Sequence, residues 1–137
     1  MSKVVVVIGL PGSGKTMFLN ELPEGEFKLF DDPGLSLEKL QALRDHVKAG
    51  GNAVITDIYM TEPSIRNLAE MELKLWGAEI EWIFFSNEPE ACIANIARRT
   101  AAGDTRVVSP GYVRQASKTY VIPEDAKRII PVWREKT

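Results

Sequence analysis

Residues 9–16 constrain the fold of this 137-residue chain more than any other segment. Their sequence, Gly-Leu-Pro-Gly-Ser-Gly-Lys-Thr, fits the pattern G-x-x-x-x-G-K-S/T at every position. A continuous run of valine and isoleucine over residues 4–8 precedes them, and such a run is typical of a strand buried on both faces. Residues 15–22 then have the composition of a short helix that ends at Pro23. The sequence therefore predicts a buried strand, a glycine-rich turn and a helix in immediate succession.

This turn has the chemistry of a phosphate-binding loop, or P-loop. Its glycines let successive backbone N–H groups point at phosphate oxygens, and the helix that follows adds the positive end of its dipole. In such a loop the Lys15 ammonium reaches the β- and γ-phosphates, and the Thr16 hydroxyl binds Mg²⁺. A chance match is the alternative, which the flanking strand and helix disfavour. We expect ATP and Mg²⁺ to bind here. The residues expected to hold them are Gly9, Pro11, Gly12, Ser13, Gly14, Lys15 and Thr16.

Strand and helix patterns alternate along the rest of the chain. Further strands are expected over residues 27–30, 53–56 and 80–85, with an edge or irregular strand over 127–133 because it contains Pro131. Helices are expected over 37–49, 63–76, 88–100 and 109–120. This alternation predicts a three-layer α/β fold in one domain over residues 1–137, with a mostly parallel sheet of four or five strands. In such sheets ligands bind beyond the carboxyl ends of the strands.

The composition excludes several other classes of protein. A net charge of −2 argues against a scaffold that holds long nucleic acids by charge, although a small substrate or the end of a strand stays compatible. The single cysteine and single histidine exclude an intrachain disulfide and metal clusters rich in Cys or His. No stretch reaches membrane-spanning length, and the N-terminal apolar run is too short for a secretory signal. We expect a cytoplasmic protein.

Three aspartates follow predicted strands, at the edge of the sheet where the P-loop is expected. Asp31 and Asp32 end the second strand, and either can accept the proton of an attacking hydroxyl in phosphoryl transfer. The alternative is that Asp-Asp-Pro-Gly is only a favourable turn sequence. Asp57 ends the third strand and can act on Mg²⁺ directly or through water, whereas the alternative is a turn or helix cap.

Three arginines flank the loop around Gly103, after the fourth predicted strand. Arg98, Arg99 and Arg106 can belong to a lid that closes over the triphosphate and neutralises charge in the transition state. The alternative is a solvated helix end, because cations are favourable at helix C-termini. We favour the lid role for Arg98 and Arg99, and favour it only slightly for Arg106.

Two further arginines are weaker candidates, and the three tryptophans are not candidates. Arg66 and Arg114 could bind a substrate anion. Trp76, Trp82 and Trp133 are interpreted as packing residues rather than as a platform for base stacking.

The order of short segments resembles a known family. The segments IGLPGSGKT, FDD, VITD, CIANIARR and RVVSP, with a tyrosine and a proline downstream, resemble the kinase domain of phage polynucleotide 5′-kinase and its small P-loop kinase relatives. This resemblance implies a nucleoside-kinase-like P-loop fold with a lid, and transfer of the γ-phosphate of ATP to a 5′-hydroxyl of DNA or RNA. It also implies that Asp31 is the general base and that Arg98, three residues after Asn95, is the lid arginine. One departure is that Pro33-Gly34-Leu35 stands where the family usually has an arginine for the acceptor strand.

Three functional hypotheses follow, and all stay open at this point. The first is a Mg²⁺-dependent ATP phosphotransferase acting on a polynucleotide 5′-hydroxyl, with Lys15, Asp31 and Arg98 as its catalytic residues. The second is a nucleoside or nucleoside-monophosphate kinase, which would use the same P-loop. The third is an ATP-binding switch or assembly protein with no acceptor. A switch usually needs a partner's arginine, so the arginines of this chain favour a kinase.

Overall fold

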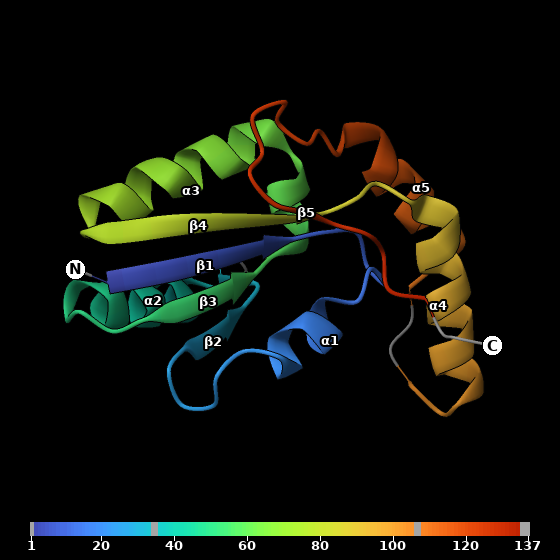
Figure 1. The fold of residues 1–137 in the computed structure, drawn as a ribbon, viewed down its shortest axis with the longest axis horizontal. Coiled ribbons are helices and arrows are strands. Elements are labelled where there is room, and N and C mark those ends of the chain that lie inside the picture. The colour runs from blue at the N-terminus through green and yellow to red at the C-terminus, as the bar shows by residue number, and fades with distance from the viewer. Residues whose placement is uncertain (1, 34–35, 106–107, 135–137) are drawn as a thin grey trace.

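The computed structural model describes residues 2–33, 36–105 and 108–134. Five parallel strands form a sheet in the order β2-β3-β1-β4-β5 (Figure 1). The strands are β1 (Ser2–Ile8), β2 (Lys28–Asp31), β3 (Ala53–Thr56), β4 (Ala78–Phe85) and β5 (Ile129–Ile130). β1 is central and pairs with β3 on one side and β4 on the other. The parallel sheet predicted from the sequence is confirmed.

Helices connect successive strands. They are α1 (Lys15–Asn20), α2 (Leu37–Lys48), α3 (Pro63–Leu75), α4 (Pro89–Ala101) and α5 (Pro110–Thr119), and a 3₁₀ helix, η2 (Ile58–Thr61), follows β3. Serine hydroxyls cap two of them: Ser36 accepts a hydrogen bond from the Lys39 N–H and Ser109 from the Tyr112 N–H, each at 3.1 Å. No helix among the described residues is long and apolar enough to cross a membrane.

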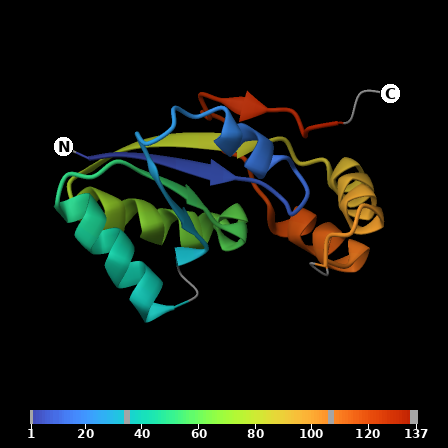
Figure 2. The same ribbon diagram turned by 90° about the horizontal axis from the view of Figure 1, so that it is seen from below.

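The two faces of the sheet are covered unequally. Alternate residues of β1 point to opposite faces, as they must in a strand. Those on the face of α2 and α3 join the larger apolar cluster, which also includes residues of α4 and α5. Those on the opposite face join a smaller cluster with Phe18 of α1. Figure 2 shows α2 and α3 on one side of the sheet and α1 on the other. Because the segments after β1 and β3 leave toward opposite faces, a ligand crevice is expected beyond the ends of these neighbouring strands.

The edge of the sheet at β5 is short. The sequence predicted a strand over residues 127–133, but only Ile129–Ile130 pairs with β4, opposite Phe84 and Phe85. Pro131 follows at once and has no N–H to continue the ladder. On this side the rest of β4 borders a hollow of about 700 Å³, between α3 and residues 123–128. Arg66, a weaker candidate, lines this hollow, but no residue of the P-loop, none of the three aspartates and neither Arg98 nor Arg99 does, so it is not the candidate site.

Candidate active site

The P-loop joins β1 to α1 and curls around its own backbone. Gly12 and Gly14 have φ values of 83° and 104°, in the left-handed region that glycine adopts without strain. The Ser13 N–H donates to the carbonyl of Leu10 at 3.1 Å, which closes the turn. The Lys15 ammonium reaches back over the loop to the carbonyl of Gly9, at 2.8 Å. The motif therefore has the strand, turn and helix context that its phosphate chemistry requires.

The same two glycines let neighbouring segments pack directly on the P-loop. A Cβ at Gly12 would lie 2.5 Å from the carbonyl oxygen of Cys92 in α4. A Cβ at Gly14 would lie 2.5 Å from the Cβ of Trp133, in the segment after β5. Neither position has room for a larger residue, so α4 and the C-terminal segment hold the loop from two sides.

The surroundings of the loop fit a bound triphosphate and Mg²⁺. The N-terminus of α1 has no side-chain cap and no acidic residue in its first turn, so it presents positive potential to an anion. The Ser13 hydroxyl is buried and has no hydrogen-bond partner among the described residues. The Thr16 side chain is exposed at the start of α1, where a hydroxyl ligand for Mg²⁺ is expected.

Asp31 and Asp32 are fixed by the end of the neighbouring strand. The Thr56 hydroxyl donates to Asp31 Oδ1 at 2.7 Å, and the Asp32 N–H donates to the Thr56 carbonyl at 2.7 Å. Asp32 has a φ of 45°, a left-handed conformation that aspartate tolerates better than most residues. Backbone outliers of this kind concentrate at functional sites. The two aspartates therefore leave the sheet at a rigid point beside the crevice.

Asp57 lies at the end of β3 and is 4% exposed. Its carboxylate accepts a hydrogen bond from the Tyr59 N–H at 2.8 Å, so it caps η2, the alternative that the sequence left open. Burial raises the pKa of Asp57, and the nearby Asp32 and Asp31 carboxylates raise it further, whereas the Tyr59 hydrogen bond and Lys15 lower it. Capping does not remove the role expected of Asp57 toward Mg²⁺, which remains a prediction.

Lys15 is linked electrostatically to the same carboxylates. Burial lowers the pKa of the Lys15 ammonium, and the charges of Asp32, Asp31 and Asp57 oppose that effect. These four side chains therefore form one cluster at the ends of β1, β2 and β3. Among the described residues, no group of three or more His, Cys, Asp or Glu side chains could hold a metal ion by itself. Mg²⁺ usually keeps several waters and takes only one or two protein ligands beside substrate phosphates, so this does not conflict with the prediction.

The predicted lid arginines lie at the end of α4. The Arg98 guanidinium donates to the side-chain oxygen of Asn95, which is buried against the P-loop. Arg99 forms an ion pair with Asp104, with 3.9 Å between Nε and Oδ2. Arg106 lies outside the described residues. The roles of these three arginines toward ATP remain predictions.

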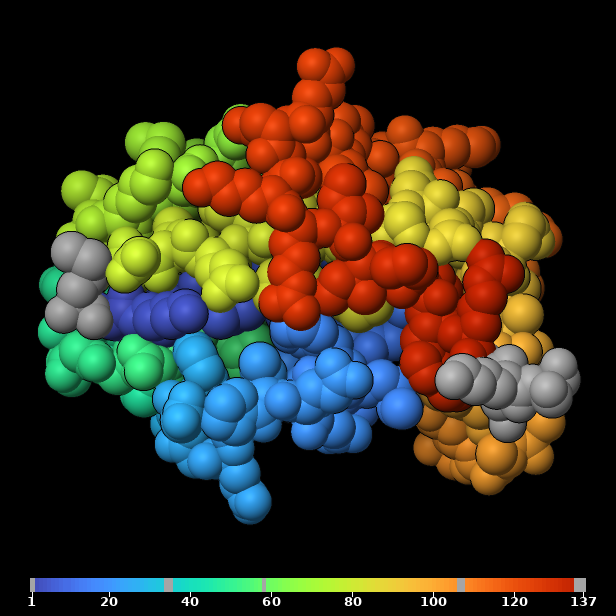
Figure 3. All heavy atoms as spheres, in the orientation of Figure 1, coloured from blue at the N-terminus to red at the C-terminus, as the bar shows by residue number. Residues whose placement is uncertain are grey.

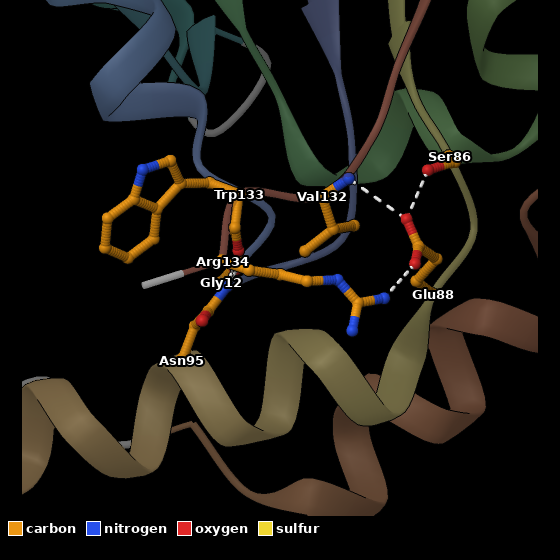
Figure 4. A network of polar contacts seen from close by, with 7 residues as sticks. All are labelled: Gly12, Ser86, Glu88, Asn95, Val132, Trp133 and Arg134. Atoms are coloured by element: carbon orange, nitrogen blue, oxygen red, sulfur yellow. Dashed lines mark hydrogen bonds and ion pairs between the residues drawn. The ribbon is translucent and has the colours of Figure 1, made fainter. Parts of the chain in front are cut away.

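Asn95 connects three parts of the site, and sequence reasoning gave it no role of its own. Its amide nitrogen donates to the carbonyl of Gly12 at 2.8 Å and to the carbonyl of Trp133 at 2.7 Å. Figure 4 shows the side chain rising from α4 toward both. Because Arg98 binds the oxygen of the same amide, one side chain couples the P-loop, the C-terminal segment and the predicted lid. Its position three residues before Arg98 was the only signal in the sequence.

Glu88 holds the C-terminal segment in place, and it too was missed. Its carboxylate accepts hydrogen bonds from the Ser86 hydroxyl at 2.6 Å and the Val132 N–H at 3.0 Å, and it pairs with Arg134. The Trp133 N–H then donates to the carbonyl of Ser13 in the P-loop at 3.0 Å. Figure 3 shows the C-terminal residues, in red, between α1 in blue and α4 in orange. Trp133 therefore lies beside the P-loop and is still 40% exposed.

The two weaker arginine candidates have partners inside the protein. Arg66 is buried, and its guanidinium donates to the carbonyls of Met60, Thr61 and Val121. Arg114 forms two hydrogen bonds with the Glu90 carboxylate, at 2.9 and 3.2 Å. Neither geometry supports binding of a substrate anion.

Comparisons with known proteins agree with the fold. No protein-family model matches this chain, and no curated protein sequence matches it significantly. A gluconokinase from Sinorhizobium meliloti 1021 superimposes with a TM-score of 0.70 at 14% sequence identity, over 97% of this chain and 84% of its own. A chain of the Pnkp1/Rnl/Hen1 RNA repair complex gives 0.63 at 14% identity, over 87% of this chain and 44% of its own. APE1195 gives 0.52 at 19% identity, over 94% and 84%. This chain therefore has the fold of the small P-loop kinases, with a parallel sheet between helices.

Proposed function

We propose that this protein is a Mg²⁺-dependent phosphotransferase that moves the γ-phosphate of ATP to a hydroxyl acceptor. The observation that carries the proposal is the group of charged side chains at the ends of β1, β2 and β3. A P-loop with its lysine lies there beside Asp31, Asp32 and Asp57, and the lysine and the carboxylates influence each other's charge. A phosphate-binding loop next to a carboxylate base is the arrangement that phosphoryl transfer needs.

Each residue has a defined task in this proposal. Asp31 accepts the proton of the acceptor hydroxyl, and its hydrogen bond from Thr56 fixes the direction of the carboxylate. The acceptor oxygen then forms a bond to the γ-phosphorus while the bond to the bridging oxygen breaks, and ADP leaves. Lys15 and Arg98 neutralise charge on the transferred group. Thr16 and Asp57 would hold Mg²⁺, which would supply positive charge to offset that of the phosphates.

The acceptor that we propose is the 5′-hydroxyl of a polynucleotide. Support comes from the resemblance of the sequence segments and from the likeness of the fold to a chain of an RNA repair complex. The gluconokinase likeness is equally a reason to test small hydroxyl compounds. A nucleoside or nucleoside-monophosphate kinase remains an alternative, as does an ATP-binding switch with no acceptor.

Transfer of labelled γ-phosphate tests the proposal. The acceptors are 5′-hydroxyl DNA and RNA oligonucleotides, nucleosides, nucleoside monophosphates and gluconate, each with ATP and Mg²⁺. We expect label on the oligonucleotide ends, and loss of transfer by orders of magnitude in Asp31→Asn with ATP affinity almost unchanged. Lys15→Ala should abolish transfer and weaken ATP binding.

The control variant is Asp32→Asn, which removes the neighbouring carboxylate from the same turn. If Asp32→Asn, and not Asp31→Asn, stops transfer, the base is the second aspartate. If only a mononucleotide or only gluconate is labelled, the protein is still a phosphotransferase, but its acceptor is that compound and not a polynucleotide. ATP binding with no labelled product would favour the switch.

A further inference from the structure

The side-chain amide of Asn95 has a partner for each of its polar atoms. Its nitrogen donates to the carbonyls of Gly12 and Trp133, at 2.8 and 2.7 Å, and its oxygen accepts from the Arg98 guanidinium. Figure 4 shows the amide between α4 and the two backbone segments that it contacts. An amide turned over would set its oxygen against two carbonyls and its N–H groups against a cation. Only one orientation therefore satisfies all three partners.

The helix that carries Asn95 is packed directly on the P-loop. Asn95 is 5% exposed. A Cβ at Gly12 would lie 2.5 Å from the carbonyl oxygen of Cys92 and 2.9 Å from Cγ1 of Ile96, the residue after Asn95. This part of α4 is therefore in contact with the backbone of the loop, and the hydrogen bond to Gly12 adds to that contact. The amide has a fixed place relative to the loop that we expect to hold the phosphates.

Arg98 lies one turn further along α4, and its side chain is exposed. Residues three apart on a helix lie on the same face, so the Asn95 amide is within reach of the guanidinium. An exposed arginine samples many rotamers, and it loses that freedom when it binds an anion. Because Asn95 already holds the guanidinium, part of this loss occurs on folding instead. The next residue, Arg99, pairs with Asp104.

We propose that Asn95 is a positioning residue, which sets the place of the Arg98 guanidinium relative to the P-loop and hence to the γ-phosphate. This inference rests on the proposed phosphotransferase function, in which Arg98 neutralises charge on the transferred group. The N–H groups of Asn95 are used by backbone carbonyls, so it acts through Arg98 and not on the phosphate itself. A cation that is in place before transfer stabilises the transition state without further reorganisation.

A double-mutant cycle on Asn95 and Arg98 tests the inference. It compares the wild type, Asn95→Leu, Arg98→Ala and the double variant. Calorimetry gives the Kd for a non-hydrolysable ATP analogue with Mg²⁺, and transfer to a 5′-hydroxyl oligonucleotide gives kcat and KM. Side chains that act through one another have effects that are not additive. We expect Arg98→Ala to lower kcat about 10- to 100-fold in the wild type and less than about threefold in Asn95→Leu, and its effect on Kd should shrink likewise.

Asn95→Asp separates positioning from a purely structural role. The carboxylate keeps an oxygen for Arg98 but cannot donate to the two carbonyls. ATP affinity should fall in this variant, yet Arg98→Ala should still have about its full effect on kcat. A role in holding the backbone alone would instead make Asn95→Asp and Asn95→Leu behave alike toward Arg98→Ala. If Asn95→Leu does not fold by circular dichroism, Asn95→Ala takes its place in the cycle.

Asn87→Leu is the matched control. The Asn87 amide also donates to two carbonyls, those of Ser117 at 2.9 Å and Tyr120 at 3.4 Å, and its oxygen accepts the Ser117 hydroxyl at 2.7 Å. These contacts join the segment before α4 to α5 and not to the P-loop. The effect of Arg98→Ala should therefore be the same in Asn87→Leu as in the wild type.

The two measurements separate this inference from the proposed function. If Arg98→Ala has equal effects on Kd and kcat in the wild type and in Asn95→Leu, or no effect in the wild type, the inference is overturned and the phosphotransferase stands. If the effects on Kd are coupled but the wild type labels no acceptor, the proposed function is rejected, and Asn95 still positions Arg98 on bound ATP.

Discussion

The surroundings of Asp57 in the fold disfavour the ionised form of its carboxylate. The residue is 4% exposed, and Asp31 and Asp32 lie near it in the same cluster. Burial and like charge both disfavour the ionised form, which is why the pKa of Asp57 is raised. A folded state that holds a proton more tightly than the unfolded chain loses stability as the pH rises through the two pKa values. At neutral pH the ionised carboxylate therefore costs stability, and the cost vanishes below its ordinary pKa of 3.8.

Asp57→Asn should consequently stabilise the protein at neutral pH. The amide oxygen still accepts the Tyr59 N–H, so the cap of η2 is kept while the charge is lost. We expect a gain of about 0.5–2 kcal/mol in the free energy of unfolding in urea at pH 7, shrinking toward zero near pH 3.8. The control is Asp125→Asn, an exposed carboxylate, which should change little at either pH. A variant less stable than the wild type at pH 7 would mean that the charged cap outweighs the repulsion.

The residues of the P-loop could be predicted from the sequence because their chemistry is local. Lys15 and Thr16 follow from spacing alone, and the structure gives them the strand, turn and helix context that the motif requires. Asn95 and Glu88 could not be predicted, because their importance comes from contacts with residues 83 and 44 positions away. A single asparagine on an amphipathic helix carries no pattern that reveals such a partner.

At the scale of elements, the helices and central strands were predicted well because each has its own periodicity and stop signals. Ser36 caps α2, Ser109 caps α5, and Gly77 follows α3 with a φ of 88°. The short turn η2 was not predicted. Its sequence, Ile-Tyr-Met-Thr, resembles a continuing strand, and what turns it is the cap supplied by Asp57. The last strand was predicted too long because contact with β4 is limited to two residues.

The C-terminal segment is held beside the P-loop by one side chain of α4's N-terminal end, Glu88. Glu88 ties residues 132 and 134 to the start of α4, which keeps Trp133 against Gly14 (Figure 4). The Ser86 hydroxyl, the Val132 N–H and Arg134 all lower the pKa of Glu88, which favours its charged form. Glu88→Ala should release the segment from the P-loop. We expect a several-fold higher Kd for ATP with Mg²⁺ by calorimetry, and a red-shifted tryptophan emission as Trp133 becomes more exposed.

Glu90→Ala is the comparison variant for this experiment. Glu90 lies two residues further along and pairs with Arg114 on the surface, where such pairs contribute about 0–1 kcal/mol. It should leave both the ATP affinity and the emission maximum unchanged. If Glu88→Ala behaves like Glu90→Ala, the segment stays on the P-loop through Asn95 and Ser13 alone.

At the scale of the whole molecule, the alternation of elements predicted a parallel sheet but not the strand order. The order β2-β3-β1-β4-β5 depends on where each helix packs, and that is settled by contacts between distant parts of the chain. The order brings the ends of β1, β2 and β3 together, so Lys15 after β1 lies near Asp31 and Asp32 at the end of β2 and near Asp57 after β3. The sequence indicated that these residues end strands. The general rule that ligands bind beyond the carboxyl ends of parallel strands then predicted that they lie at one site.

Arg66 is the side chain that joins distant parts of this architecture most directly. From α3, its guanidinium donates to Met60 at 3.1 Å and Thr61 at 3.2 Å in η2, and to Val121 after α5 at 2.7 Å. It also lies over the ring of Phe84 in β4, with 5.2 Å to the ring centre. Burial lowers its pKa, so a planar guanidinium, which stays charged at any accessible pH, suits the position better than an ammonium.

Arg66→Met should therefore destabilise the whole fold. It keeps much of the packing volume but removes the guanidinium donor from three carbonyls, of which only that of Thr61 keeps another, the Val121 N–H at 3.4 Å, so we expect a loss of about 2–4 kcal/mol in urea unfolding at pH 7. Arg66→Lys should recover only part of this loss, because one ammonium cannot reproduce the forked geometry. Arg44→Met, which removes an exposed arginine paired with Asp45, should stay within about 0.5 kcal/mol of the wild type. An equal midpoint for Arg66→Met and the wild type would show that water replaces the guanidinium at no net cost, and that η2 and the segment after α5 are held by their apolar contacts instead.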